Sequence, residues 1–236
     1  FDYVEIPVHG VDAIIAGRLN ERRVREVKTI LAGHDFRYTV HSPDPLNLFD
    51  IEHQAWHKDV FRSSIAFAKE IGAETVVYHA GCEDAHHEKP GLSQEELKAI
   101  ERESLLEMAE LAVAAGVTIG VENGGRESYS GVIAELVTQV CAVAHPAVGI
   151  TFDFGHAFLT AQQHGFDYLS AVHMAAPHIV HLHVHDNCGR VVNLPSGVPY
   201  IFSAPFGVGD LHMPPGWGSI PYERIFSGLH LPPSVF

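Results

Sequence analysis

The stretch HIVHLHVHDN contains three histidines, His181, His183 and His185, that alternate with Leu182 and Val184. Alternation at period two is typical of a β-strand, because successive side chains of a strand point to opposite faces of the sheet. Imidazole is both a common metal ligand and a proton-transfer group. The pattern therefore predicts a strand with its chemistry on one face and with aliphatic side chains packed on helices on the other.

Strand-like runs recur along the whole chain, and segments with helical periodicity lie between them. The clearest helix has a capping box of Ser93 and Glu96 at its start and Gly116 at its end. The predicted strands are residues 2–8, 37–42, 75–81, 117–123, 148–154 and 178–186, and the predicted helices are residues 20–33, 54–72, 93–116, 130–144 and 167–176.

A strand–helix unit repeated six times predicts an α/β fold with a parallel sheet. Two architectures fit this repeat, an open doubly wound sheet and a (β/α)8 TIM barrel. The first strand is not followed by the glycine-rich turn of a dinucleotide-binding sheet. The polar residues favour the barrel, whose active sites lie at the carboxyl ends of the strands.

One face of each predicted strand is apolar, and the other is small or polar and ends in an ionisable residue. Val117, Ile119 and Val121, for example, oppose Gly120 and Glu122. A lone inward histidine is usually a satisfied core residue, but six such strand ends would destabilise one another unless a positive ion held them together. We therefore expect a metal site. The inward set is Glu5, His41, His79, Glu122, Asp153, His181, His183 and His185.

Three further residues fit the same chemistry. His156 follows Asp153 in FDFGHAF, and Asp210 and His212 have a spacing that allows both to bind one ion. An exposed loop is the alternative interpretation of Asp210 and His212. The histidine-rich run at residues 85–89 is interpreted as solvated surface.

Composition and charge limit the classes of partner. The formal net charge of −14 opposes binding to nucleic acid, and the chain has no membrane-spanning apolar run and no signal-peptide pattern. Three unevenly spaced cysteines favour a reducing, cytoplasmic location over a disulfide framework. The sequence starts and stops within strand-like segments, so we expect an incomplete chain.

The motifs VENGG, FDFGHAF, HLHVHDN and GDLHMPPGWGSIPY, in this order, resemble those of the xylose-isomerase-like TIM barrels. That family includes sugar phosphate isomerases and epimerases and the apurinic endonucleases of the endonuclease-four type (AP endonuclease family 2). The resemblance implies one incomplete barrel domain over residues 1–236, with the first strand cut and strands seven and eight largely missing. It also implies a homodimer or homotetramer, since barrels of this family often pair.

The resemblance also implies ligands for one to three divalent ions. A single ion would be held by Glu122, Asp153, His183 and a strand-seven glutamate beyond Phe236. The endonucleases use further ligands, which would correspond here to His41, His79, His156, Asp210 and His212. His181 and His185 would then support these ligands or face the substrate.

Two enzyme functions follow, and the first is isomerisation or epimerisation of a small sugar, sugar phosphate or polyol. Mn, Mg, Co, Fe or Zn would stabilise an enediolate, and Glu122 and the strand-seven glutamate would transfer protons. The expected substrate contacts are Glu5, His185, Trp217 and Arg126, with further aromatic walls from Tyr200, Phe202 and Phe206.

The alternative is a multinuclear zinc phosphodiesterase of the endonuclease-four type. The full histidine set favours this function, whereas the acidic charge opposes it, because the loops near the site offer few cations, chiefly Lys89, Arg126 and Arg190. A third hypothesis is a non-catalytic metal-binding barrel, which would have a closed metal site without a position for water or substrate.

Overall fold

The computed structural model describes residues 2–83, 91–125, 128–191 and 203–232. Six parallel strands form one curled sheet in the order β1-β4-β5-β6-β7-β8. Each strand pairs with the next one in this order. The strands are β1 (Tyr3–Pro7), β4 (Arg37–His41), β5 (Thr75–His79), β6 (Thr118–Glu122), β7 (Val148–Asp153) and β8 (Ile179–His183).

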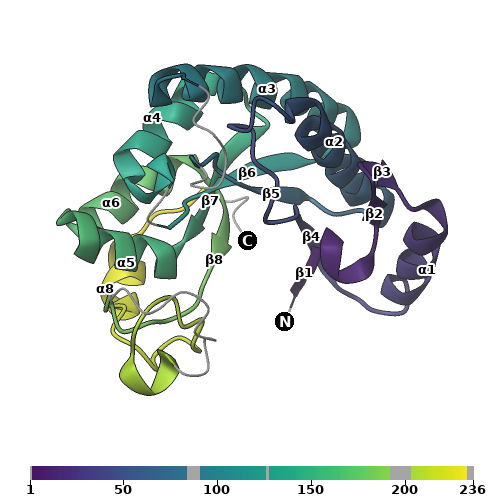
Figure 1. Cartoon of the computed structure of the whole chain (residues 1–236). Coiled ribbons are helices and arrows are strands. Elements are labelled where there is room, and N and C mark those ends of the chain that lie inside the picture. Colours follow the sequence, from purple (N-terminus) through teal and green to yellow (C-terminus); the bar gives the residue numbers. More distant parts are fainter. Residues whose placement is uncertain (1, 84–90, 126–127, 192–202, 233–236) are drawn as a thin grey trace.

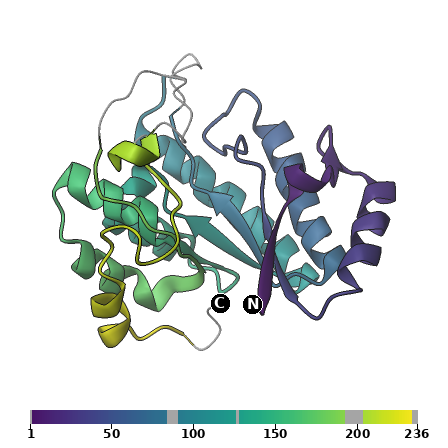
Figure 2. The same cartoon turned by 90° about the horizontal axis from the view of Figure 1, so that it is seen from below.

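Helices cover the convex side of this sheet, and its concave side faces the interior of a half-barrel (Figure 1). The helices are α1 (Glu21–Leu31), α2 (Gln54–Ile71), α3 (Gln94–Ala115), α4 (Ile133–Val143), α5 (Phe154–His164), α6 (Tyr168–Ala175) and α8 (Tyr222–Gly228). The sheet is thus part of a TIM barrel, as the sequence predicts. Seen from below, β1, drawn in purple, lies at one edge of the open sheet (Figure 2).

The apolar face of each strand forms the core with the helices. Tyr78, Phe152 and Ile119 are fully buried, and they belong to one continuous cluster that includes Phe61 of α2 and Leu105 of α3. The predicted outward orientation of this face is confirmed. Parallel sheets that are covered on their outer face need such apolar runs.

The small residues of the inner face are also explained by packing. A Cβ atom added at Gly120 of β6 would overlap with Oγ1 of Thr151 on β7. The side chain of Thr151 fills the space beside position 120, so no further side chain fits there and glycine is required.

The structure differs from the predicted elements at several places, and helix α8 is one that the sequence did not predict. β8 ends at His183, so Val184 lies beyond the strand and is 42% exposed instead of packing on a helix. A short hairpin of β2 (Ile14–Ile15) and β3 (Arg18–Leu19) follows β1. Helix α5 begins directly after β7, where no helix was predicted.

Four short 3-10 helices complete the described elements, namely η1 (Val8–Val11), η2 (Tyr129–Gly131), η3 (Ala176–His178) and η4 (Ala204–Phe206). Within the described ranges, none of the helices has the length and apolar character that crossing a bilayer requires.

Candidate metal centre

The inward ionisable residues meet at the carboxyl ends of the strands. His41, His79, Glu122, Asp153 and His183 are the last residues of their strands. Because the strands are parallel, their last residues lie at the same edge of the sheet, where His79 pairs with Glu122 and Asp153 pairs with His183. The sequence prediction that these side chains converge is confirmed.

Glu122 lies at the centre of the first group, and its side chain is almost completely buried. Its Oε1 is 3.0 Å from Nδ1 of His183. Its Oε2 is 3.0 Å from Nε2 of His79 and 3.4 Å from Nε2 of His41. One carboxylate thus contacts histidines from three other strands.

Asp153 connects β7 to α5. It is the N-cap of α5, and its Oδ1 accepts a hydrogen bond of 2.7 Å from the backbone N–H of His156. Its Oδ2 is 2.9 Å from Nε2 of His185 and 3.7 Å from Nδ1 of His183. The cap fixes the position of the carboxylate, because one oxygen is committed to the helix and the other is directed toward the histidines.

A second group lies next to the first and contains His156, His185, Asp210 and His212, each with a ligand atom within 4.8 Å of the others. Oδ2 of Asp210 is 3.2 Å from Nε2 of His156 and 2.7 Å from Nε2 of His212. The rings of His185 and His212 stack with their centroids 3.9 Å apart. Asp210 and His212 therefore belong to a cluster with two histidines and do not form an isolated exposed loop.

Glycine at position 155 allows the second group to form. A Cβ atom added at Gly155 would overlap with the ring of His185. The first turn of α5 thus lies directly against this imidazole, which places it between Asp153 and Asp210.

Glu5 of β1 reaches across the barrel interior to β8. Its carboxylate is 3.0 Å from Nε2 of His181 and 3.2 Å from Nε2 of His183, and it accepts a hydrogen bond from Thr39. His183 therefore has a carboxylate at each ring nitrogen, Glu122 at Nδ1 and Glu5 at Nε2.

The charges of the centre are strongly coupled. Burial opposes the imidazolium of His183, but hydrogen bonds to Glu122 and Glu5 outweigh it and raise its pKa to about 11. Burial likewise opposes the charge on His156, while Asp153 and a hydrogen bond to Asp210 raise its pKa to about 10. Without a metal ion, protonated histidines therefore balance the buried carboxylates.

The carboxylates respond in the opposite direction. Burial alone would raise the pKa of Glu122, but hydrogen bonds from His183, His41 and His79 hold it well below its usual range. The pKa values of Glu5 and Asp210 are also lowered, because their histidine neighbours outweigh burial. All three carboxylates are ionised at neutral pH.

The polar atoms of both groups fit a bound cation. Within the described residues, Oε2 of Glu122, Oδ1 of Asp210 and Nδ1 of His185 are buried and receive no well-aligned hydrogen bond. Nδ1 of His156 is 3.0 Å from the carbonyl of Asn123, and Nδ1 of His41 is 2.7 Å from the carbonyl of Ser42. This leaves Nε2 of each ring to face a carboxylate, the arrangement usual for metal-ligating histidines.

Some residues predicted to contact the substrate are not part of this cluster. Trp217 lies in the loop after β8, is 74% exposed and is in none of the ligand groups. Phe206 is 67% exposed. Arg126, Lys89, Tyr200 and Phe202 lie outside the described residues, as does the run at 85–89.

Two residues that support the site were not predicted from the sequence. The side chain of Asn123, which is fully buried, accepts a hydrogen bond from the N–H of Asp153 and donates one to its carbonyl. The carboxylate of Asp186 accepts hydrogen bonds from the N–H groups of Gly216 and Ile220 and so anchors the returning loop. Asn123 directly follows the predicted ligand Glu122 in the motif VEN, and Asp186 follows the predicted ligand His183 by three residues in HVHD. This proximity to a ligand is the sequence signal that could have identified them.

A cavity of 360 Å³ opens beside the cluster. His79 and His156 line it together with residues of the loops after β4, β5 and β6, including Leu46, Asn47 and Ser128. One histidine of each group thus faces a space of the size of a small ligand.

The comparisons with known proteins agree with this geometry. The family model of the xylose isomerase-like TIM barrel matches residues 1–232, so the chain belongs to this family. None of the curated proteins compared matches the chain.

Several solved structures share the fold. A D-tagatose 3-epimerase-like protein has 23% identity and a TM-score of 0.73, with 96% of this chain and 76% of that chain covered. An IolI protein with a binding zinc atom has 17% identity and a TM-score of 0.70, with 100% and 78% covered. The D-psicose 3-epimerase of Clostridium cellulolyticum H10, solved with D-tagatose, has 20% identity and a TM-score of 0.63, with 85% and 68% covered.

Proposed function

We propose that the protein is a divalent-metal-dependent isomerase or epimerase of a small sugar, sugar phosphate or polyol. The observation that supports this most strongly is the set of Glu122, Asp153 and His183 at the mouth of the half-barrel, in which the buried Oε2 of Glu122 receives no well-aligned hydrogen bond. Active sites of TIM barrels lie at this end of the strands.

Glu122, Asp153 and His183 would hold the ion through two carboxylates and one imidazole. This donor set suits Mn, Mg, Co, Fe or Zn. A divalent ion bound there would act as a Lewis acid that polarises the substrate carbonyl and stabilises negative charge on adjacent oxygens.

Glu122 is the proposed proton-transfer group. It is ionised at neutral pH, since hydrogen bonds from histidines hold its pKa low. It lies between His79, which lines the 360 Å³ cavity, and His183. It would therefore accept a proton from the substrate carbon next to the carbonyl group.

The remaining polar groups would position the substrate. His185 and Glu5 lie next to the proposed ligands Asp153 and His183, and their polar atoms are suited to bind hydroxyl groups. The names of the structural neighbours support a carbohydrate substrate, because two of them are described as 3-epimerases or epimerase-like.

The second ligand group favours a second candidate function. His156, Asp210 and His212 with His185 would bind a further ion, and a multinuclear zinc site is suited to hydrolysis of phosphodiesters. The net charge of −14 opposes a nucleic acid substrate, so we rank this candidate below the isomerase.

Exchange with heavy water would distinguish the two functions. The protein is loaded with Mn²⁺ and incubated in D₂O with D-tagatose, D-psicose or D-fructose, and deuterium at the carbon atoms next to the carbonyl is followed by NMR. We expect metal-dependent incorporation that is lost in Glu122→Gln. Absence of exchange with all three sugars, together with zinc-dependent cleavage of bis(4-nitrophenyl) phosphate, would support the hydrolase instead.

A further inference from the structure

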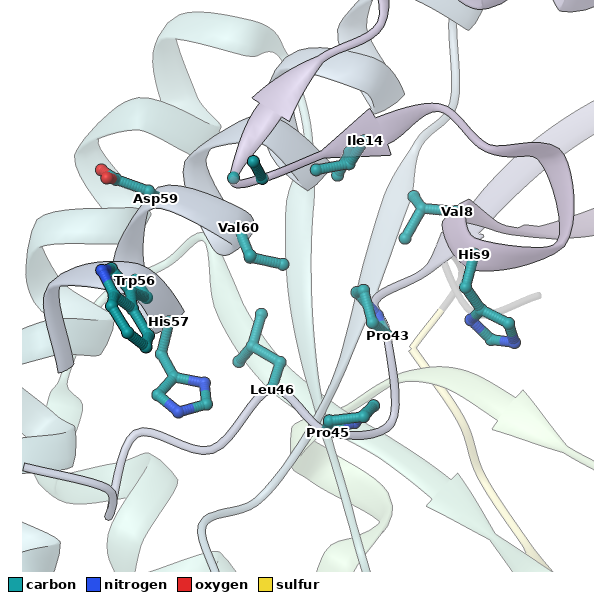
Figure 3. Close-up of a pocket in the computed structure, with 12 residues that line it drawn as sticks. Val8, His9, Ile14, Pro43, Pro45, Leu46, Trp56, His57, Asp59 and Val60 are labelled. Carbon is teal, nitrogen blue, oxygen red and sulfur yellow. The ribbon is translucent and has the colours of Figure 1, made fainter. Parts of the chain in front are cut away.

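A cavity of 580 Å³ lies between the β2–β3 hairpin, the loop after β4 and the start of α2. Val8, Ile14, Pro43, Leu46 and Val60 surround a common space (Figure 3). Val8 and Leu46 are buried. The wall is thus aliphatic, and the volume is that of a typical small-molecule pocket.

This cavity is separated from the one at the metal centre by a single stretch of chain. Pro43 and Pro45 line the 580 Å³ cavity, whereas Asp44 lines the 360 Å³ cavity beside His79 and His156. Leu46 lines both cavities. A ligand bound at the metal centre would therefore need to extend past only one short segment to reach the apolar space.

Two polar residues that line this cavity, His57 and Asp59, are already paired, whereas His9 is exposed. Nδ1 of His57 accepts a hydrogen bond from the N–H of Asn47, so its Nε2 donates to Asp50 at 3.2 Å. The carboxylate of Asp59 pairs with Arg62 at 2.6 Å. Both ring nitrogens of His57 are therefore paired, and neither is available to a sugar hydroxyl.

The walls are fixed by hydrogen bonds. Ser63 of α2 donates to the carbonyl of Gly17 in the hairpin at 2.7 Å. The side-chain amide of Asn47 donates to the carbonyl of Cys82, and the N–H of Leu46 donates to the carbonyl of Pro43. The cavity is therefore formed before any ligand binds, which lowers the entropic cost of filling it.

We propose that this cavity binds an apolar ring or chain attached to the sugar or polyol, so that the substrate class is a carbohydrate with an apolar substituent. The inference rests on the proposed function for the sugar half of the ligand. Trp56, 69% exposed at the rim, and the two proline rings provide flat surfaces for an aromatic group.

Binding of 4-nitrophenyl β-D-glucopyranoside, compared with methyl β-D-glucopyranoside, tests this directly by titration calorimetry. We expect at least about tenfold tighter binding of the nitrophenyl compound, because its ring would leave water. Val60→Phe should remove this preference by filling the cavity. Val113→Phe, the same change at an exposed position of α3, should leave it within twofold of the unchanged protein.

Tryptophan fluorescence provides a second measurement that does not depend on the folding of Val60→Phe. The sequence has two tryptophans, so Trp217→Phe leaves only Trp56 and Trp56→Phe leaves only Trp217. The nitrophenyl compound should quench Trp217→Phe strongly and Trp56→Phe weakly. The reverse pattern, or equal affinity for both glucosides, would overturn the proposal.

A second copy of the chain is the competing occupant of the cavity. Sedimentation at rising protein concentration, with and without the nitrophenyl compound, would overturn the proposal if a dimer formed and the compound dissociated it. Binding is measured without turnover, so failure to isomerise any sugar would count against the proposed function and leave this result unaffected.

Discussion

Each ring nitrogen of His183 faces a carboxylate, and this single residue shows why the cluster needs a cation. Glu122 at Nδ1 and Glu5 at Nε2 both lie within 3.2 Å. A protonated imidazole can satisfy both in the absence of metal, whereas a metal ion at Nδ1 leaves Nε2–H to donate to Glu5. Glu5 would then hold the ring in the orientation that metal binding requires.

The central carboxylate gives the first prediction. Glu122→Gln keeps the size of the side chain but removes its charge, so we expect turnover to fall by about 10²–10⁴-fold and metal affinity to drop. Steady-state kinetics and elemental analysis measure the two effects. Glu103→Gln, at an exposed position of α3, is the matched control and should change neither. Unchanged turnover in Glu122→Gln would rule out the proposed role.

Gly155 gives a second prediction at the residue scale. Gly155→Ala places a methyl group against the ring of His185, so we expect a loss of about 1–3 kcal/mol in the free energy of unfolding and weaker binding of the ion at the second group. Urea unfolding and zinc titration test this. A variant as stable as the unchanged protein, with the same zinc affinity, would show that His185 does not need this close contact.

At the scale of single elements, α3 holds the loops after β5 and β6 through one buried carboxylate. Glu101 accepts hydrogen bonds from Tyr78, Tyr129, Gln139 and the N–H of Gly81. Gly81 follows the proposed ligand His79 by two residues, and Tyr129 begins η2, the 3-10 helix after β6. The outer helix layer thus contributes directly to the shape of the site.

This network predicts a large effect on stability. Glu101→Ala leaves four buried donors without their acceptor, so we expect it to cost about 3 kcal/mol or more. Glu103→Ala, an exposed neighbour, should stay within about 0.5 kcal/mol. Urea denaturation measures both. If Glu101→Ala and Glu103→Ala had equal free energies of unfolding, water would replace the buried carboxylate of Glu101 without loss of stability.

The elements also show how far the sequence could be interpreted. Period-two alternation assigned the inner face of all six strands correctly, because the face toward the helices must be apolar and the other face need not be. Helix α5 was missed because FGHAF follows the strand without a loop, and its cap, Asp153, is also a site residue. The β2–β3 hairpin is too short for any periodic pattern.

The site itself could be predicted only in part. The strand ends bring Glu122, His79 and His183 together through the register of the sheet, which follows from the fold. The second group depends on Asp210 and His212 lying against His185, a long-range contact that no local pattern encodes. Two long-range hydrogen bonds, from the N–H groups of Gly216 and Ile220 to Asp186, hold the segment after His212 against the end of β8.

For the whole molecule, the coupled charges predict a pH dependence of stability that changes with metal. The pKa values of His183 and His156 are raised to about 11 and about 10, so the stability that they contribute is fully present below about pH 6.5 and is lost as the pH rises toward those values. The lowered pKa values of Glu5 and Asp210 contribute stability that is lost as the pH falls below about 4.5.

The metal-free protein should therefore be most stable between about pH 4.5 and 6.5. Thermal unfolding in EDTA from pH 4 to pH 9 would show this as a falling Tm above pH 6.5. With excess Mn²⁺, Tm should instead rise with pH over this range, because metal ligation requires deprotonated histidines. A Tm in EDTA that rises steadily from pH 6 to pH 9 would contradict the charge balance described above.

For the molecule as a whole, the central claim is that the inward carboxylates and histidines bind a divalent ion. The metal content of the purified protein tests this claim most directly. The protein is purified without added metal and analysed for elements, beside Asp153→Asn and a His41→Ala, His212→Ala double variant. We predict at least one divalent ion per chain that is lost in Asp153→Asn and retained in the double variant. Protein that binds no ion, even after incubation with Mn²⁺, Co²⁺ and Zn²⁺, would contradict the central claim.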